Sequence, residues 1–303
     1  MILLKEIITK LNPVEFSGNA ETPVERVAEL SDNNLKPGDI IWCSDKNAAL
    51  LSSLLNGTVI LSPAAFATIK TTKTDYTKLN WIVVNVPRRA FMQMLQSFFV
   101  RKNSPSVSPG SHIHPSVILP PGSSIGHGVV IEEGCVIGNN VSIGHNSVIG
   151  YNTIIEDDVI IGSNNTIGGI GFGYEKTEDG KYEMIPHIGN VHICTGAEIG
   201  NNSAIDRAVI GSTKIGPNAK IDNLVHIAHG VKIGANSLII AHAMIAGSVE
   251  IGENVWVSPA ASILQKIKVG KNSLIGMGSV VLADVPENKI VVGAPAKIIR
   301  DNS

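Results

Sequence analysis

The middle of the chain carries an aliphatic residue at every sixth position. This phase holds without a break at Ile113, Leu119, Ile125, Ile131, Ile137, Ile143, Ile149, Ile155, Ile161 and Ile167. A period of six matches neither an α-helix nor an isolated hairpin, and short fixed periods are typical of repeat architectures. The pattern therefore predicts a mainly β fold, a parallel β-helix in which three short strands make each coil.

The same phase extends to about residue 284, with one long interruption. It pauses at Gly169, resumes near Ile193, and is expected to slip by one residue at Ile210 and Ile215. We therefore expect a β-helix over 113–284 that contains a loop insertion over 169–192. One aliphatic side chain of each strand would point inward and stack on the coil below, about 4.8 Å away. A coil accommodates an insertion by looping it outward, and long loops on rigid scaffolds commonly carry function.

The two ends of the chain follow other patterns. Residues 1–100 lack the six-residue phase, and their mixture of helical spacing and short aliphatic runs predicts a small N-terminal α/β domain. Residues 101–112 are rich in serine and proline and are predicted to be a linker. Residues 285–303 are expected to leave the β-helix as a C-terminal tail.

Composition and charge exclude several classes of function. The net charge is −2, so there is no electrostatic basis for binding nucleic acid or an anionic membrane surface. The three cysteines, Cys43, Cys135 and Cys194, are widely spaced and indicate neither a disulfide framework nor a metal site. No apolar run approaches the roughly 18 residues of a membrane span, and charge appears too early at the N-terminus for a signal peptide. We expect a cytoplasmic protein without a bound metal.

Several stretches carry motifs beyond the repeat itself. They are 22–30, 36–40, 171–174 with 185–186, 205–207, 221–223 and 227–229. These stretches resemble the hexapeptide-repeat acyltransferases, and most of all the UDP-3-O-(3-hydroxyacyl)glucosamine N-acyltransferases of lipid A synthesis. The resemblance implies a left-handed β-helix and a homotrimer with active sites in grooves between chains. It also implies an N-terminal domain that helps to bind a uridine nucleotide, and no tightly bound cofactor.

Amide formation from a thioester needs a base near the incoming amine. His229 is our candidate, because it follows the inward Ile227 by two residues, past the small Ala228, and should lie outside the core. The resemblance favours it over the neighbouring His226. Asp222 lies seven residues before His229, on the adjacent strand of the same coil. Its carboxylate has three open roles: to orient a histidine across a subunit groove, to bind the sugar, or to stay solvated at a corner.

Other residues are candidates for substrate contacts. Trp42 follows a predicted strand and is either a platform for a nucleobase or part of the domain core. Phe172 and Tyr174 stand between glycines in the insertion, where they are expected to cover the active site. His226 neighbours the candidate base on the same coil. Asn223 either holds an amide of a pantetheine arm or is a turn asparagine.

The chain departs from the resembled family in ways that bear on the acyl donor. Asn47 stands where the family has a second uracil-contacting aromatic, and 262–267 lacks a second histidine. The C-terminus resembles the coenzyme A-using sugar acetyltransferases instead of ending in a helical extension for acyl carrier protein. This resemblance would place four residues near the adenine and phosphates of coenzyme A, unless they only cap the β-helix: Gly278, Pro295, Lys297 and Arg300.

These features favour an N-acyltransferase that moves a short acyl group from acyl-CoA to the amine of a nucleotide-linked amino sugar, for a surface glycan such as O-antigen. The first alternative is the lipid A enzyme itself, which uses acyl carrier protein. The second is a zinc enzyme resembling the γ-carbonic anhydrases, whose closely paired histidines this chain lacks. A non-catalytic solenoid fits least, because the chain also carries an N-terminal domain and an insertion. The nucleotide, the sugar and the acyl length stay open.

Overall fold

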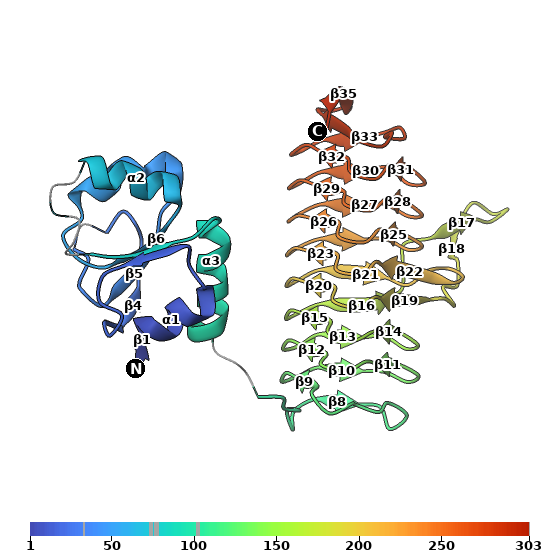
Figure 1. Ribbon diagram of the computed structural model, residues 1–303. Helices are drawn as coiled ribbons and strands as arrows, with labels where there is room; N and C mark the ends of the chain where they lie inside the picture. Colours follow the sequence, from blue (N-terminus) through green and yellow to red (C-terminus); the bar gives the residue numbers. More distant parts are fainter. Residues whose placement is uncertain (33, 73–74, 76–78, 101–103, 303) are drawn as a thin grey trace. The chain divides into compact units, whose positions relative to one another are not determined.

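The computed structural model describes residues 1–32, 34–72, 75, 79–100 and 104–302, which form two compact units, Met1–Asn103 and Ser104–Ser303 (Figure 1). Strand pairing in the second unit begins before residue 113, because Val107 bridges to Ile125 and Ser108 donates its N–H to the Ile125 carbonyl. The predicted linker, 101–112, is therefore too long at its C-terminal end. Its first three residues lie outside the described part of the chain.

The N-terminal unit is a three-layer α/β sandwich. Its elements are β1 (Ile2–Leu3), α1 (Leu4–Leu11), β2 (Glu15–Ser17), β3 (Pro23–Val24), β4 (Arg26–Val27), β5 (Asp39–Trp42), the 3-10 helix η1 (Asp45–Ser53), β6 (Thr58–Leu61), α2 (Pro63–Thr72), β7 (Asn80–Val83), α3 (Pro87–Met94) and the π-helical turn η3 (Leu95–Phe99). The main sheet has the order β2-β7-β6-β5-β4. Ile40, Ile60 and Ile82 pack with α1 and α3 on one face of this sheet, whereas the alternate residues pack with η1 and α2 on the other.

The α/β class predicted for this unit is correct, but β2 and α2 do not stand out from the residue pattern. β2 is a short edge strand antiparallel to β7. α2 buries only Ala65, Phe66 and Ile69 among alanines and threonines, so its apolar stripe is too weak to stand out from the sequence. Among the described residues, no helix has both the length and the apolar character needed to cross a membrane.

The second unit is a parallel β-helix with three faces, named here by their strands. The nine-strand face holds β8 (His112–Ile113), β10 (Val130–Ile131), β13 (Val148–Ile149), β16 (Thr166–Gly169), β21 (Ala204–Asp206), β24 (His226–Ile227), β27 (Met244–Ile245), β30 (Ser262–Ile263) and β33 (Val280–Val281). The seven-strand face holds β11 (Val136–Ile137), β14 (Ile154–Ile155), β19 (Asn190–Ile193), β22 (Ser212–Ile215), β25 (Lys232–Ile233), β28 (Glu250–Ile251) and β31 (Lys268–Val269). The ten-strand face holds β9 (Ser124–Ile125), β12 (Ser142–Ile143), β15 (Ile160–Ile161), β20 (Glu198–Ile199), β23 (Lys220–Ile221), β26 (Leu238–Ile239), β29 (Trp256–Val257), β32 (Leu274–Ile275), β34 (Lys289–Val292) and β35 (Lys297–Asp301).

Strand register confirms the six-residue phase. Ile131 pairs with Ile149, Ile149 with Ile167, and Ile167 with Ile205, and all four side chains are fully buried. Burying an isoleucine contributes about 1.5–3 kcal/mol relative to exposure, so the inward column is the main source of stability. Most corners carry a residue in the left-handed region, commonly an asparagine such as Asn140 with φ 56°. Asparagine visits this region more readily than most residues.

The insertion and the phase slip differ from the prediction. β16 continues to Gly169 and β19 begins at Asn190, so the loop covers 170–189 instead of 169–192. It projects a hairpin of β17 (Tyr174–Lys176) and β18 (Tyr182–Met184) away from the β-helix (Figure 1). Ile210 is 79% exposed, and the next residue of the β-helix hydrophobic cluster after Ile205 is Ile215. The predicted one-residue slip is therefore wrong, because the extra residues before β22 loop outward.

The C-terminal residues also differ from the predicted tail. Val285 bridges to Val269, and β34 stacks in parallel on β32 with Val291 opposite Ile275. β35 then turns back antiparallel to β34. The chain therefore does not leave the β-helix at residue 285, and its last residues close the C-terminal end of the hydrophobic column. Covering an open strand edge in this way protects it from pairing with other chains.

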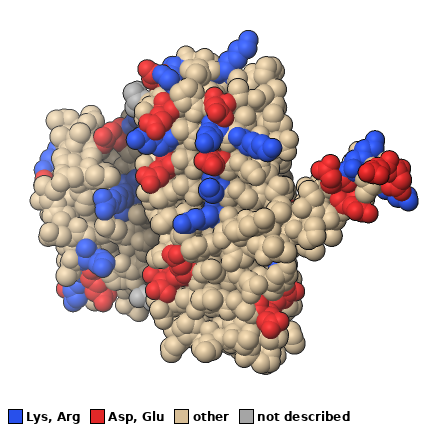
Figure 2. Space-filling view, turned by 90° about the vertical axis from the view of Figure 1, so that its right-hand side faces the viewer, with Lys and Arg blue, Asp and Glu red and all other residues tan. Residues whose placement is uncertain are grey.

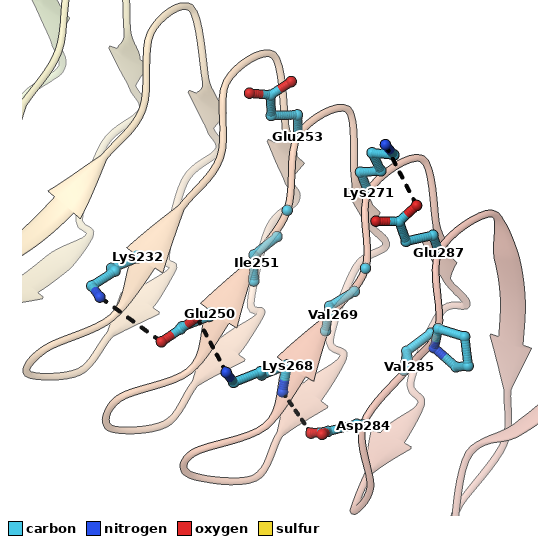
Figure 3. A pocket seen from close by; sticks show the side chains of 13 residues that line it. Lys232, Glu250, Ile251, Glu253, Lys268, Val269, Lys271, Asp284, Val285 and Glu287 are labelled. Carbon is cyan, nitrogen blue, oxygen red and sulfur yellow. Dashed lines mark hydrogen bonds and ion pairs between the residues drawn. The ribbon is translucent and has the colours of Figure 1, made fainter.

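The outward residues differ between the faces. Figure 2 shows charged side chains on the C-terminal half of the β-helix and on the hairpin. On the seven-strand face Glu250 lies between Lys232 and Lys268, with carboxylate-to-ammonium distances of 3.8 Å to each, and Asp284 accepts the backbone N–H of Lys268 (Figure 3). The open hollow along these strands, ≈ 610 Å³, is thus lined by paired charges.

Candidate active site

His229 lies at the corner between the nine-strand and seven-strand faces, two residues after β24 ends. Its carbonyl accepts the N–H of Ser248 at 2.9 Å, which fixes the corner, and its imidazole is half-buried. The ring lies directly against Gly247, where a Cβ atom would come within 2.8 Å of Nε2. Only a glycine at position 247 leaves room for the imidazole in this orientation.

A second histidine, His187, packs edge-on against His229. The two ring centroids are 5.3 Å apart at an interplanar angle of 80°. His187 comes from the insertion and is only 5% exposed. The residue pattern alone does not indicate a role for His187. Its position in a long loop, close after Pro186, is a signal that could have marked it, but the six-residue phase cannot place a loop residue against a coil.

The electrostatics of this corner favour a neutral His229. Burial lowers the pKa of His229, and positive charge on His187 would lower it further. Burial raises the pKa of Asp206, and attraction from His226 and His187 opposes that rise. Asp206 Oδ2 lies 3.7 Å from Nε2 of His226, whose side chain stays exposed on the nine-strand face. A neutral imidazole has the unprotonated nitrogen that a general base needs.

Asp222 does not meet His229 within one chain. It follows β23 and lies at the opposite corner of the nine-strand face, where Oδ1 accepts the N–H of Asn223 and Oδ2 accepts the N–H of Ala241. Asn223 is itself a corner residue, because its Oδ1 accepts two N–H groups of Asn201. Both side chains hold their corners, and only a second chain could bring such a carboxylate to His229.

The two aromatics of the insertion do not cover the histidines with their rings. Phe172 is 85% exposed and contacts Tyr174, with ring centroids 4.9 Å apart. The backbone of Gly171 lies against both histidines instead: a Cβ atom there would be 2.9 Å from Nε2 of His187 and 3.0 Å from Cβ of His229. The loop therefore covers this corner through glycines.

The residues proposed for coenzyme A gather at the C-terminal end of the β-helix. Gly278 precedes β33, and Pro295, Lys297 and Arg300 lie exposed in or beside β35. On the nine-strand face β24 and β33 are separated by β27 and β30. At about 4.8 Å per strand, Gly278 lies some 14 Å along the axis from the level of β24, and β35 lies further along because it follows β34 at the end of the ten-strand face.

Trp42 lines a hollow within the N-terminal unit. The hollow has a volume of ≈ 380 Å³ and is bordered by Val27, Ala28, Glu29, Leu30, Trp42, Ser44, Asn47 and Phe91. Trp42 is half-buried, and its ring centroid lies 6.2 Å from that of Phe91. The ring is therefore neither wholly in the core nor free, and Asn47 stands at the same hollow.

Among the described residues, one group has the donor set and spacing for a metal ion: Glu156, His192 and Cys194. Glu156 is already used by the protein, since Oε1 lies 2.7 Å from Nε2 of His192 and Oε2 accepts the N–H and hydroxyl of Thr195. Burial raises the pKa of the Cys194 thiol, which favours its protonated form. This arrangement is a completed hydrogen-bond network, and we assign it no metal.

Comparison with known proteins identifies the repeats. Four overlapping or adjoining stretches, 110–145, 134–169, 212–247 and 248–283, match the family described as bacterial transferase hexapeptide (six repeats). The UDP-N-acetylglucosamine acyltransferase of Francisella novicida superposes with a TM-score of 0.60 at 26% identity, covering 65% of this chain and 71% of that one. LpxA of Acinetobacter baumannii, at 23% identity and a TM-score of 0.57, has the same fold. The second unit is therefore a left-handed β-helix, as predicted, and its matched stretches are hexapeptide repeats.

Curated relatives carry a more specific name. A UDP-3-O-acylglucosamine N-acyltransferase of Cytophaga hutchinsonii is 53% identical over 79 residues, which cover 26% of this chain and 23% of that protein. A protein of the same name from Oleidesulfovibrio alaskensis is 51% identical over 79 residues, with the same coverage. The aligned region spans about a quarter of these relatives. The predicted resemblance to this group of N-acyltransferases is confirmed over that region.

Proposed function

We propose that the protein is an N-acyltransferase that moves an acyl group from a thioester to the amine of a UDP-linked glucosamine. The observation that carries this proposal is His229: a half-buried imidazole, whose pKa is lowered by burial, at a corner of a hexapeptide-repeat β-helix. The names of the relatives over the matched region support the same chemistry. They favour the lipid A alternative over the surface-glycan prediction made from the C-terminal residues.

The chemistry follows from the position of the base. The acceptor amine attacks the thioester carbonyl carbon, and a C–N bond forms while the nitrogen passes one proton to the unprotonated nitrogen of His229. Collapse of the oxyanion breaks the C–S bond, and His229 returns the proton to the leaving thiolate. General base catalysis of this kind contributes about 10²–10⁴-fold to a rate.

The hollow beside Trp42 is the proposed site for the nucleobase. An indole ring stacks on any base, with a contribution of roughly 1–3 kcal/mol. The half-buried position of Trp42 and the presence of Asn47 at the same hollow support this assignment. Asn47 can donate and accept hydrogen bonds and so suits the imide edge of uracil.

A donor competition tests the proposed function. The protein is incubated with a UDP-linked 3-O-acylglucosamine and equal concentrations of 3-hydroxyacyl carrier protein and a short acyl-CoA, and products are resolved by mass. We expect an amide product, formed mainly from the carrier protein. Turnover with acyl-CoA alone would restore the surface-glycan hypothesis, and turnover with neither donor would contradict acyl transfer.

We also propose that the active unit is a homotrimer. The outward residues of the nine-strand face are small or apolar in most rungs, as at Val130, Val148 and Ala204, whereas the seven-strand face carries paired charges. Asp222 and His229 meet only if a neighbouring chain supplies one of them. Light scattering at micromolar concentration should give three times the mass of one chain, and a monomer would contradict the trimer.

Replacing Gly247 by alanine should displace the base without unfolding the protein. The new Cβ would lie 2.8 Å from the His229 ring, which must rotate away. We expect a loss of kcat/KM of about 10-fold or more, within the range for a misplaced general base. Gly110→Ala on the first coil is the control. Equal activity of both variants would show that the ring position is unimportant.

The pH dependence should reveal the lowered pKa of His229. Because burial lowers this pKa, the imidazole stays unprotonated, and the enzyme active, to a lower pH than an ordinary histidine allows. We expect kcat/KM to rise with pH through a midpoint below about 6.5, the usual histidine value, and then to level. A midpoint above that value would contradict the assignment of His229 as the base.

A further inference from the structure

His187 carries a buried acceptor that has no use in the resting protein. Its Nδ1 lies 2.7 Å from the carbonyl oxygen of Ile185. A carbonyl only accepts, so Nδ1 must carry the hydrogen, and in the neutral ring Nε2 is then the lone-pair acceptor. Among the described residues, this Nε2 has no hydrogen-bond partner although it is buried. Leaving a buried polar atom unpaired costs about 1–3 kcal/mol, so its retention calls for a reason.

The surroundings hold His187 in place. Its carbonyl accepts the hydroxyl of Tyr151 at 3.2 Å, and the ring of Tyr151 lies beneath the guanidinium of Arg207, 3.3 Å from the centroid. Arg207 is itself buried and donates from Nε to the carbonyl of Gly168. Residues of the β-helix therefore fix the backbone of His187, and the carbonyl of Ile185 in the insertion fixes its ring. Such supporting contacts are what hold a functional side chain in a fixed geometry.

Proton transfer during acyl transfer makes His229 a hydrogen-bond donor, which Nε2 of His187 lacks in the resting protein. When His229 takes the proton of the amine, its ring becomes an imidazolium with two N–H groups. One N–H hydrogen of His229 came from the substrate amine. The other N–H group also needs a hydrogen-bond acceptor, because the site is partly buried. The rings of His187 and His229 meet edge-on with centroids 5.3 Å apart, and the buried Nε2 of His187 has no other partner among the described residues, which makes it a candidate acceptor.

We propose that His187 is a positioning residue that accepts a hydrogen bond from protonated His229 through Nε2, and so stabilises the imidazolium during acyl transfer. This inference rests on the proposed function. No atom is gained or lost at His187, since the proton stays on His229 and returns with the leaving thiolate. An interaction made only after proton transfer raises kcat and leaves substrate binding unchanged. The geometry is that of a base supported by a third group.

Two substitutions separate this role from simple packing. His187→Leu fills similar space without an acceptor, whereas His187→Gln offers an amide oxygen. Tyr182→Leu, at a 70% exposed position of the same insertion, is the control. We expect kcat to fall about 10²-fold in His187→Leu with KM unchanged, a loss within the range of general acid–base effects. In His187→Gln, kcat should be at least about tenfold higher than in His187→Leu. Equal kcat values in His187→Leu and the wild type would overturn the proposal.

A spectroscopic measurement distinguishes this inference from the proposed function. ¹⁵N chemical shifts of the histidine rings in the full-length protein report which nitrogen carries the hydrogen, whether or not acyl transfer is detected. We expect His187 to be protonated at Nδ1 alone, with its Nε2 signal moving toward that of a hydrogen-bonded nitrogen as His229 is protonated in acid. A hydrogen on Nε2 of His187 at neutral pH, or an Nε2 signal that ignores the protonation of His229, would overturn it.

Discussion

Replacing His229 by alanine is expected to lower kcat/KM for acyl transfer by about 10²–10⁴-fold, the usual contribution of a general base. The loss follows because the ring of His229 lies against Gly247, whereas the neighbouring His187 is buried and its Nδ1 is bound to the carbonyl of Ile185. His229 lies outside the hydrophobic column, so its removal takes away no core contact. The thermal unfolding midpoint should therefore stay close to that of the wild type, and initial rates at saturating donor measure the effect.

His226→Ala is the matched control for this substitution. His226 lies three residues earlier on the same coil, exposed on the nine-strand face, and its Nε2 is 3.7 Å from Asp206. We expect it to lose much less activity than His229→Ala. If His229→Ala kept activity within a few-fold of the wild type while His226→Ala lost it, the base would have to be reassigned to His226.

The second large effect concerns the N-terminal unit. Deleting residues 1–103 should leave a folded β-helix but remove most of the affinity for the UDP-linked acceptor. The hydrophobic cluster of the β-helix contains no residue of the N-terminal unit, and each coil contacts only its neighbours. Loss of base stacking alone, roughly 1–3 kcal/mol, weakens binding by about 5–150-fold. Calorimetric titration with UDP and circular dichroism measure the two parts of this prediction.

Trp42→Ala in the full-length chain separates the ring from the rest of that unit. The substitution should reproduce a large part of the affinity loss, because the indole borders the hollow beside Asn47. Unchanged affinity for UDP in both the truncated protein and Trp42→Ala would assign the N-terminal unit another role. A truncated protein that no longer folds would contradict the independence of the β-helix.

The β-helix could be predicted because each coil depends on residues that recur at a fixed short spacing along the sequence. Each inward position needs one aliphatic side chain that stacks on its equivalent in the next coil, as Ile149 does on Ile131 and Ile167. The corners need residues that tolerate positive φ. The segments that interrupt the six-residue spacing could not be assigned to the core or to an outward loop in the same way. At Ile210 the aliphatic residue is present, but the chain loops outward and leaves it exposed.

The candidate site was only partly predictable. His229 follows an inward residue at a fixed offset, so its place outside the core could be expected. The contact with His187 depends on how the insertion folds back, which the period of the coils does not encode. Asp222 and the C-terminal group lie at the ends of strands that one chain keeps apart from His229, so spacing along the sequence could not decide whether they meet.

The central claim is that the reacting group of the acceptor is an amine. Purified protein with 3-hydroxyacyl carrier protein should be given two acceptors in parallel, a UDP-linked 3-O-acylglucosamine with a free amine and UDP-N-acetylglucosamine, whose amine is blocked. We predict that only the first acceptor gains the mass of one acyl group, and that the new bond resists mild base as an amide does. Acylation of UDP-N-acetylglucosamine alone, giving a base-labile ester, would contradict it.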